Sequence, residues 1–426
     1  MFKNLLPLAA LFMGSAFLLF AGGLNGLILP LRGEMEGFSA ASLGLLGTGW
    51  AIGYVVGCLR TPALVAKVGH IRAFGVMCSI AAITVLLALI FMTPYIWIPL
   101  RALSGFCFAG AAMIVESWLN ERTESASRGR VFGAYTMVNL AATTLGQMSL
   151  TLGDARGYLF FVVAAIVYCM ALLPTALSAT STPTALVSVS LNVRGLWRNS
   201  PIALFGVLMV GVSNSTFGTL AAVYGARMDL TTTQIALFAS IPILAGAAAQ
   251  LPIGILSDRH DRRIVLIGIT ALALLADAVF VFSGITAPTF LLINSGIFGA
   301  AIYAMYPVIV AHANDHAPPG TFIQVSGGLL LVYGVGSIIG PTAAGVAITS
   351  YGPHSLFMAT GAAHVMLLLF AVIRLRARAS VSAQKKGLFQ MSPIARASTP
   401  ETAALAVGTK GESDHLSSSD RPSDQG

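Results

Sequence analysis

The sequence predicts an all-α integral membrane protein whose twelve transmembrane helices form two pseudo-symmetric six-helix bundles. Three observations support this prediction. The 426 residues are 56% apolar and only 9% charged, with a mean hydropathy of +0.83, whereas soluble domains are about 25% charged. Uncharged runs recur along the chain, and about 20 apolar residues are enough to span a bilayer. Lys and Arg gather in alternate loops, which indicates one orientation in the membrane.

Each span is assigned to an uncharged run, and a run too long for one helix is divided at a turn signal. Residues 316–373 divide at Gly352 and Pro353, because Pro lacks a backbone donor and Gly relaxes the chain. The run 278–314 divides near Pro288. The expected spans are 5–30, 40–60, 73–93, 95–118, 130–152, 157–177, 200–224, 233–256, 264–284, 287–311, 321–349 and 354–374. The first is expected to be a mature helix, since its uncharged stretch exceeds the core of a cleavable signal.

The charged residues predict the topology. Most basic residues between Arg60 and Arg263 fall in loops on one side, whereas Arg32, Arg156 and Arg227 fall on the other. Because basic loops stay in the cytoplasm, we expect a multi-pass protein of the inner (plasma) membrane with both termini cytoplasmic. The net charge of +8 then reflects topology and attraction to anionic membrane lipid, and no nucleic acid is expected.

A polar stretch divides the chain into two halves. Residues 178–199 are rich in Ser and Thr and separate the sixth span from the seventh. The sequences GGLN and GVSN place an Asn at corresponding positions of spans one and seven, as internally repeated transporters do. The segment 376–426 has too few large apolar residues to fold alone. We therefore expect an N-terminal bundle, a cytoplasmic central loop, a C-terminal bundle and a disordered cytoplasmic tail, over 1–177, 178–199, 200–375 and 376–426.

A dense charge cluster, GILSDRHDRR at 254–263, lies between two apolar runs. It resembles the signature loop of the major facilitator superfamily, in which Gly and Asp precede a turn and paired basic residues. The matching positions are Gly254, Asp258, Arg262 and Arg263. The resemblance extends over the predicted spans and implies a twelve-helix bacterial permease.

The resemblance implies that this loop is a cytoplasmic gate. Asp258 is expected to pair with an Arg and to face the positive end of a neighbouring helix. Such contacts would hold the two halves together and would break for inward opening. The alternative is a solvated loop that only sets the topology.

The corresponding loop of the first half is expected to be a degenerate copy. It keeps Gly57 and Arg72 but has Thr61 near the position of the Asp. Its latch is expected to use Glu116, at the cytoplasmic end of span four. The candidate partners of Glu116 are Arg122, Arg128 and Arg130, and surface pairing alone is the alternative.

The resemblance also implies a central cavity lined by spans 1, 4, 7 and 10, with solute near the membrane midplane. The polar candidates in or beside these spans are Asn25, Arg101, Asn214, Asn294, Tyr303 and Tyr306, with Gln147 and Gln250 as neighbours. Each amide could instead form a helix–helix hydrogen bond, worth about 0.6 kcal/mol in a membrane. Asp277 is a candidate for coupling because intramembrane carboxylates are costly, although its span is peripheral in the resembled fold. His364 is expected to be structural.

Arg101 begins the sequence RALSG, which is similar to the Arg-x-x-x-Gly element of span four in the family. In proton-coupled members this element influences coupling. Two placements of the side chain are open: it lines the cavity, or it extends to the outer headgroups.

These features favour a secondary active transporter that moves a small organic solute by alternating access, coupled to protons and directed to export. The alternatives are an uptake symporter or facilitator of the same fold, and a non-transporting receptor or scaffold. An enzyme is disfavoured, because the sequence has no H-E-x-x-H zinc helix and no G-x-x-x-x-G-K-[ST] phosphate loop. No cofactor or metal is expected, and the chain is expected to be a monomer. The residue types of the cavity suit a neutral, lipophilic or weakly anionic solute.

Overall fold

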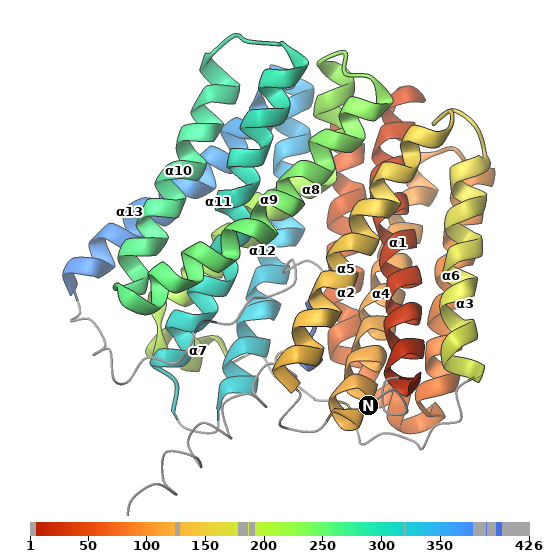
Figure 1. Cartoon of the computed structure of the whole chain (residues 1–426). Helices are drawn as coiled ribbons and strands as arrows, with labels where there is room; N and C mark the ends of the chain where they lie inside the picture. Colours follow the sequence, from red (N-terminus) through yellow and green to blue (C-terminus); the bar gives the residue numbers. More distant parts are fainter. Residues whose placement is uncertain are drawn as a thin grey trace, which may run out of the picture.

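A computed structural model describes residues 6–123, 128–177, 186, 192–318, 321–377, 389 and 398–402. Within them the regular structure is helical (Figure 1). The first half contains α1 (Leu6–Met35), α2 (Ala40–Val68), α3 (His70–Ile90), α4 (Pro94–Arg122), α5 (Arg128–Met148) and α6 (Leu159–Leu177). The short helix α7 (Val193–Asn199) precedes the second half. That half contains α8 (Pro201–Arg227), α9 (Thr232–Arg259), α10 (Arg262–Phe282), α11 (Pro288–Asp315), α12 (Phe322–Tyr351) and α13 (Ser355–Ala377).

Each expected span corresponds to one long helix. Ten of the described helices are long and apolar enough to cross a membrane. The apolar stretch of α6 is shorter, Leu159–Thr175, and α5 carries more polar residues, among them Asn139 and Gln147. Both α5 and α6 pack against α1, so they complete the first group of six helices.

Several helices extend past the uncharged runs that predict them. The apolar count ends the second span at residue 60, yet α2 continues through Pro62 to Val68. Only Gly69 separates it from α3, so the expected loop of the first half is almost entirely helical. Likewise α9 continues to Arg259, which places Asp258 on a helix end rather than in a turn. A charged side chain ends an apolar run, but it does not end a helix. Its charged group can reach water while the backbone continues to form helical hydrogen bonds.

Glycines bring helices within each half into close contact. Gly49, Gly53 and Gly57 recur every four residues along the face of α2 that meets α4, and a Cβ atom at Gly53 would overlap the backbone of Ala102. In the second half a Cβ atom at Gly211 of α8 would likewise overlap the backbone of α12. Small residues of this kind allow packing between helices where no hydrophobic effect draws them together.

The two halves meet at one face of the molecule. We call the face that carries the start of α1 and the α9–α10 junction the terminal face, and the opposite face the distal face (Figure 1). At the distal face, Arg227 at the end of α8 pairs with Glu34 at the end of α1, with Nε and Oε1 2.7 Å apart. Ser240 of α9 donates a hydrogen bond of 2.9 Å to Gln147 of α5. These contacts close the distal face.

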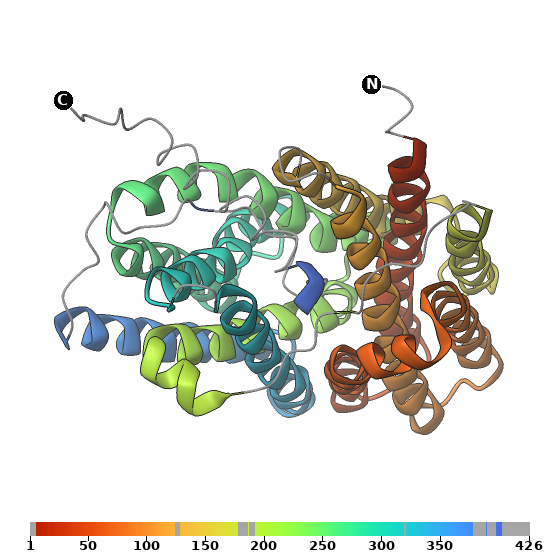
Figure 2. The same cartoon turned by 90° about the horizontal axis from the view of Figure 1, so that it is seen from below.

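The C-terminal segment differs from its expectation where the structure describes it. Most of 178–199 and 376–426 lies outside the described residues. However, residues 398–402 are buried, and seen from below they form the short blue element between the two halves (Figure 2). The expectation that 376–426 is disordered therefore does not hold for these residues, because the space between the halves offers them partners.

Candidate functional site

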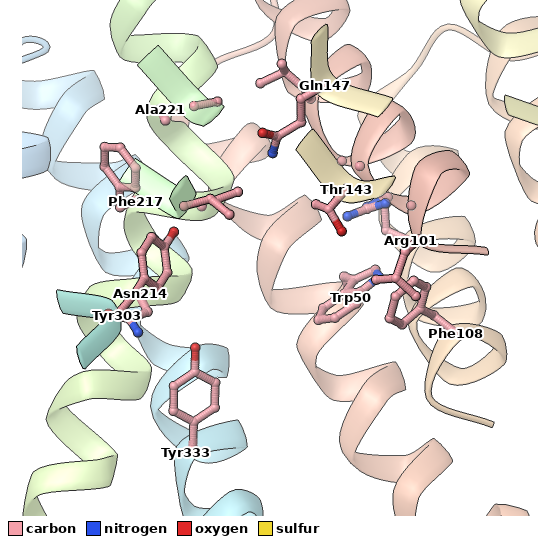
Figure 3. A pocket seen from close by; sticks show the side chains of 18 of the residues that line it. Trp50, Arg101, Phe108, Thr143, Gln147, Asn214, Phe217, Ala221, Tyr303 and Tyr333 are labelled. Atoms are coloured by element: carbon pink, nitrogen blue, oxygen red, sulfur yellow. The ribbon is translucent and has the colours of Figure 1, made fainter. Parts of the chain in front are cut away.

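A cavity lies at the centre of the molecule, and both halves contribute to its wall (Figure 3). Its volume is about 120 Å³, counted as the space open to the centres of water-sized spheres, and one water needs only about 10–15 Å³ by this measure. The larger lining side chains are Trp50, Arg101, Phe108, Thr143, Gln147, Tyr168, Asn214, Phe217, Tyr303 and Tyr333. A wall of apolar and aromatic residues with a few polar groups is typical of sites for small organic molecules.

Arg101 provides a cation in the N-terminal wall of the cavity. It is the eighth residue of α4, which places its backbone about 10 Å from the distal start of that helix. Its residue is only 6% exposed, and it lies near Tyr168 of α6. The sequence left two placements of this side chain open. In the structure it lines the cavity and does not extend to the outer headgroups.

Asn214 provides a hydrogen-bond acceptor in the C-terminal wall. Its Nδ2 lies 3.5 Å from the carbonyl oxygen of Ile302, at the limit of a hydrogen bond. Within the described part of the chain its buried Oδ1 has no hydrogen-bond partner. A buried amide oxygen without a partner is costly. At the wall of a cavity it can accept a hydrogen bond from a solute.

The cavity contains four of the residues proposed from the sequence, namely Arg101, Gln147, Asn214 and Tyr303. Two other candidates lie close to it. Asn25 lines a small separate pocket beside Arg101. Tyr306 packs against Tyr333, with ring centroids 5.6 Å apart.

Three further candidates have other surroundings. Asn294 of α11 donates a hydrogen bond of 3.0 Å to the carbonyl of Ala276 on α10, which is the helix–helix alternative considered for amides. Gln250 is buried in α9 away from the cavity wall. Asp277 also lies outside that wall.

Asp277 belongs to a buried polar chain that links α8, α10 and α13. Its Oδ2 is 2.6 Å from Nδ1 of His364, and its Oδ1 accepts a hydrogen bond of 2.6 Å from Thr360. The other ring nitrogen of His364 is 2.9 Å from the hydroxyl of Ser213, next to Asn214 in the sequence. His364, which is expected to be structural, is thus paired with Asp277. The chain could hold a proton in a region otherwise filled by apolar side chains.

The charged loop is held within the C-terminal half. Asp258 pairs with Arg262 at 3.1 Å, as expected, and Arg262 also pairs with Asp315 of α11 at 2.7 Å. The positive end of α10 is capped by Asp261, however, whose side chain accepts a hydrogen bond from the backbone N–H of Arg263. Asp258 was expected to face such a helix end, but it lies on α9, three residues before the cap.

The gate candidates of the first half do not form one cluster. Gly57 packs α2 against Phe106 of α4, and Arg72 and Arg130 are exposed. Glu116 is fully buried, and it accepts a hydrogen bond of 3.0 Å from Tyr135 of α5. It also accepts hydrogen bonds from Thr399 and Thr402 of the C-terminal segment. The described partners of Glu116 are thus hydroxyl groups, in place of the arginines considered from the sequence.

Several cavity residues lie outside the four spans that the family resemblance places around the cavity. Tyr168 reaches the cavity from α6 and Tyr333 from α12, while Trp50 comes from α2. Phe108 and Phe217 lie on the expected spans but carry no polar group. A search for Tyr and Trp within any apolar span would have found the first three.

The comparisons with known proteins agree in one family. The sequence profile of the Major Facilitator Superfamily matches residues 11–245 and 203–409. The "Uncharacterized MFS-type transporter YcaD" of Salmonella arizonae is 25% identical over 366 residues, which cover 85% of this chain and 94% of the relative. The protein of that name from Salmonella typhimurium is also 25% identical over 366 residues, with the same shares of 85% and 94%.

Two solved transporters have a similar fold. The nucleoside transporter NupG aligns with a TM-score of 0.74 at 15% identity, over 88% of this chain and 100% of that chain. A bacterial homolog of the human lysosomal transporter Spinster, in an inward-facing and unoccupied conformation, aligns with a TM-score of 0.66 at 15% identity, over 91% and 99%. These alignments confirm the expected fold class.

Proposed function

The chain belongs to the major facilitator superfamily as an MFS-type, multi-pass membrane transporter, and from this premise we propose that it moves a small organic solute through the central cavity by alternating access. The cavity between the halves is the observation that carries the proposal. Its wall takes residues from both halves, so a rocking motion of one half against the other changes the face to which it opens.

The predicted orientation in the membrane supports an inward-facing conformation of the transporter. Positive loops favour the terminal face as the cytoplasmic side of the inner membrane, with both termini on that side. The distal face, closed by the Glu34–Arg227 pair, is then external. In this assignment the structure is an inward-facing state of a monomeric transporter.

The chemistry of the wall suggests the class of solute. Asn214 offers a buried acceptor, and Arg101 contributes a permanent positive charge. The remaining large lining residues are mostly aromatic. These groups fit a neutral or weakly anionic organic molecule with an apolar body and at least one hydrogen-bond donor.

Proton-coupled export is the direction and coupling that we infer. The Asp277–His364 pair supports coupling, because a carboxylate and an imidazole joined at 2.6 Å can share and release a proton within the membrane. The Arg-x-x-x-Gly element that contains Arg101 is consistent with this inference. The direction is measured in the transport assay from the sign of the pH gradient that drives flux.

The test begins with a thermal-shift screen of neutral and weakly anionic organic compounds against the purified protein. Flux of a stabilising compound is then measured in liposomes with an imposed pH gradient. Arg101→Lys should reduce flux by about tenfold or more, because it keeps the charge but loses the planar fork. Arg198→Lys, at an exposed position, is the matched control and should keep the parental rate.

The outcomes separate the alternatives. Flux that follows the solute gradient alone would indicate a facilitator, and inward accumulation would indicate an uptake symporter. Binding without flux in any gradient would contradict transport and favour a receptor. Normal flux by Arg101→Lys at unchanged thermal stability would remove Arg101 from the proposed site.

A further inference from the structure

The C-terminal segment 398–402 is buried deep between the two halves. Ser398, Thr399, Glu401 and Thr402 are each no more than 5% exposed. Figure 2 shows this segment between the two halves at the terminal face. Polar residues from a Ser- and Pro-rich tail seldom become buried unless specific partners receive them.

The hydrogen-bond partners of the segment come from two helices of the first half. The carboxylate of Glu116 on α4 accepts hydrogen bonds from the hydroxyls of Thr399 and Thr402, the latter at 2.8 Å. Tyr54 of α2 donates a hydrogen bond of 2.5 Å to the carbonyl oxygen of Ser398. Tyr135 of α5 completes the surroundings of Glu116. A buried carboxylate thus receives three hydroxyl donors, two of which belong to the tail.

The segment also has an internal structure that suits it to this site. The backbone N–H of Thr399 donates to the hydroxyl of Thr402 at 2.7 Å, and the N–H of Glu401 donates to the hydroxyl of Thr399 at 3.2 Å. Pro400 fixes the backbone between them. Such side-chain-to-backbone bonds form a compact turn, which presents both hydroxyls to Glu116 on the same side.

A second contact attaches the tail to the other half. The backbone N–H of Phe389 donates to both carboxylate oxygens of Asp258, at 3.0 and 3.1 Å. The ring of Phe389 lies on Gly254, where any side chain would overlap it. Two residues of the signature loop, Gly254 and Asp258, therefore bind the tail in this structure.

The segment 398–402 is connected to the wall of the central cavity through α2. Trp50, which lines the cavity, stacks on Tyr54 with ring centroids 4.9 Å apart. Tyr54 in turn binds Ser398. When segment 398–402 is bound, it therefore lies between the cavity and the terminal face.

We propose that the space between the halves at the terminal face contains a binding site for a hydroxyl-bearing peptide turn, formed around Glu116 and Asp258, and that its ligand is the chain's own C-terminal segment, bound through Phe389 and residues 398–402. Bound there, the tail connects the two halves, obstructs the path from the cavity and prevents the terminal face from closing. It is therefore an autoinhibitory ligand. The binding is independent of the proposed function, whereas the inhibition rests on it.

Cysteine cross-linking in the full chain tests the binding. The four native cysteines are replaced, and Gly254→Cys is combined with Phe389→Cys, whose side chains would meet across the contact described above. Ile255→Cys with Phe389→Cys is the matched control, because Ile255 lies at the same depth of α9 but is exposed. Efficient disulfide formation is expected only in the first pair. Equal formation in both pairs, or in neither, would overturn the proposal.

Loss of the two hydroxyls tests the site around Glu116. The double variant Thr399→Val and Thr402→Val keeps the side-chain volume but removes both donors to Glu116, together with the two hydroxyl acceptors that hold the turn. It should reduce cross-linking between positions 254 and 389 by roughly tenfold, which corresponds to about 1.4 kcal/mol. Thr409→Val is the same change farther along the tail and should have no effect. Unchanged cross-linking in the double variant would rule out Glu116 as the anchor.

Flux distinguishes this inference from the proposed function. The double variant should transport the solute several times faster than the parent, because the path from the cavity is free more often. Equal rates with cross-linking lost would overturn the inhibition but leave transport intact. If no solute is transported by any variant, the proposed function fails, while the cross-linking result still decides whether the tail binds.

Discussion

At the residue scale, Asp261 caps the start of α10, and the strength of this cap depends on the ionisation of its carboxyl group. Its side chain accepts a hydrogen bond of 2.9 Å from the N–H of Arg263 and pairs with the guanidinium of Arg263 at 2.7 Å. Burial raises the pKa of Asp261, but the hydrogen bonds and charge of Arg263 outweigh burial and hold the pKa below its ordinary value. The carboxylate therefore stabilises the folded protein.

Asp261→Ala should lower the free energy of unfolding by about 1 kcal/mol near neutral pH, the usual value of an N-cap. Because the folded pKa lies below the unfolded value of about 3.9, the contribution is complete above that pH and is lost as the pH falls through the folded pKa. Thermal unfolding in detergent from pH 7 to about pH 3 measures the difference. Asp261→Asn, which keeps the cap without the charge, should show a smaller loss. A difference that grows at low pH would contradict this assignment.

The second prediction at the residue scale concerns Asp277. If the Asp277–His364 pair holds the coupling proton, Asp277→Asn should abolish accumulation driven by a pH gradient but preserve exchange of solute across the membrane. A purely structural pair would affect both activities equally. Removing one partner of a buried pair costs about 3–5 kcal/mol, so thermal stability must be measured alongside. Thr360→Val, which loses one hydrogen bond but keeps the carboxylate, is the control and should retain coupling.

At the scale of helices, the packing of α2 on α4 depends on the absence of side chains. The three glycines of α2 lie against the backbone of α4, which allows the cavity residues Trp50 and Arg101 to face each other from adjacent helices. Their spacing could be read from the sequence, but the helix that they contact could not.

Gly53→Ala should therefore destabilise the protein by at least 1–3 kcal/mol, the usual cost of overpacking, because the added methyl group overlaps Ala102. Gly133→Ala is the matched control, since a Cβ atom there meets nothing within 4 Å. Alanine at that exposed helical site should stabilise by up to about 1 kcal/mol. Thermal unfolding of both variants provides the comparison, and equal effects would show that the α2–α4 contact can relax.

At the scale of the whole molecule, an ion pair joins the two halves at the distal face, whereas the tail contacts both halves at the terminal face. The Glu34–Arg227 pair joins the halves where they meet, with both side chains partly exposed. The ion pairs that the structure describes for the charged loop lie within the second half. Residues 398–402 of the tail are buried between the two halves.

Loss of the distal pair should shift the population toward distal opening. Glu34→Gln should lengthen distances between spin labels at Met35 and Thr233, measured by pulsed electron resonance. The expected shift is about fivefold in population or less, because a partly exposed ion pair contributes about 1 kcal/mol or less. The charge swap Glu34→Arg with Arg227→Glu should restore the parental distances. Identical distributions in the parent and Glu34→Gln would show that the pair does not hold the face closed.

The sequence by itself determined which segments form long apolar helices, because the transfer of apolar side chains into lipid is a local property of each segment. The orientation of these helices in the membrane stays a prediction from the basic loops. It also indicated Arg101, Asn214, Gln147 and Tyr303 as cavity residues once the family resemblance had ordered the spans. It could not show where the helices end, because the charges that limit an apolar run do not stop a helix.

Only the tertiary structure decided which buried polar groups meet. Asp277 and His364 are 87 residues apart, and Glu116 and Thr399 are 283 apart. Apolar helices with similar patterns can pack in many registers, so the pattern does not specify which polar residues become neighbours. A buried polar group gains stability only from the partner that its own packing brings within hydrogen-bonding distance. That requirement gave the tail, which the composition predicts to be disordered, a defined place against Glu116.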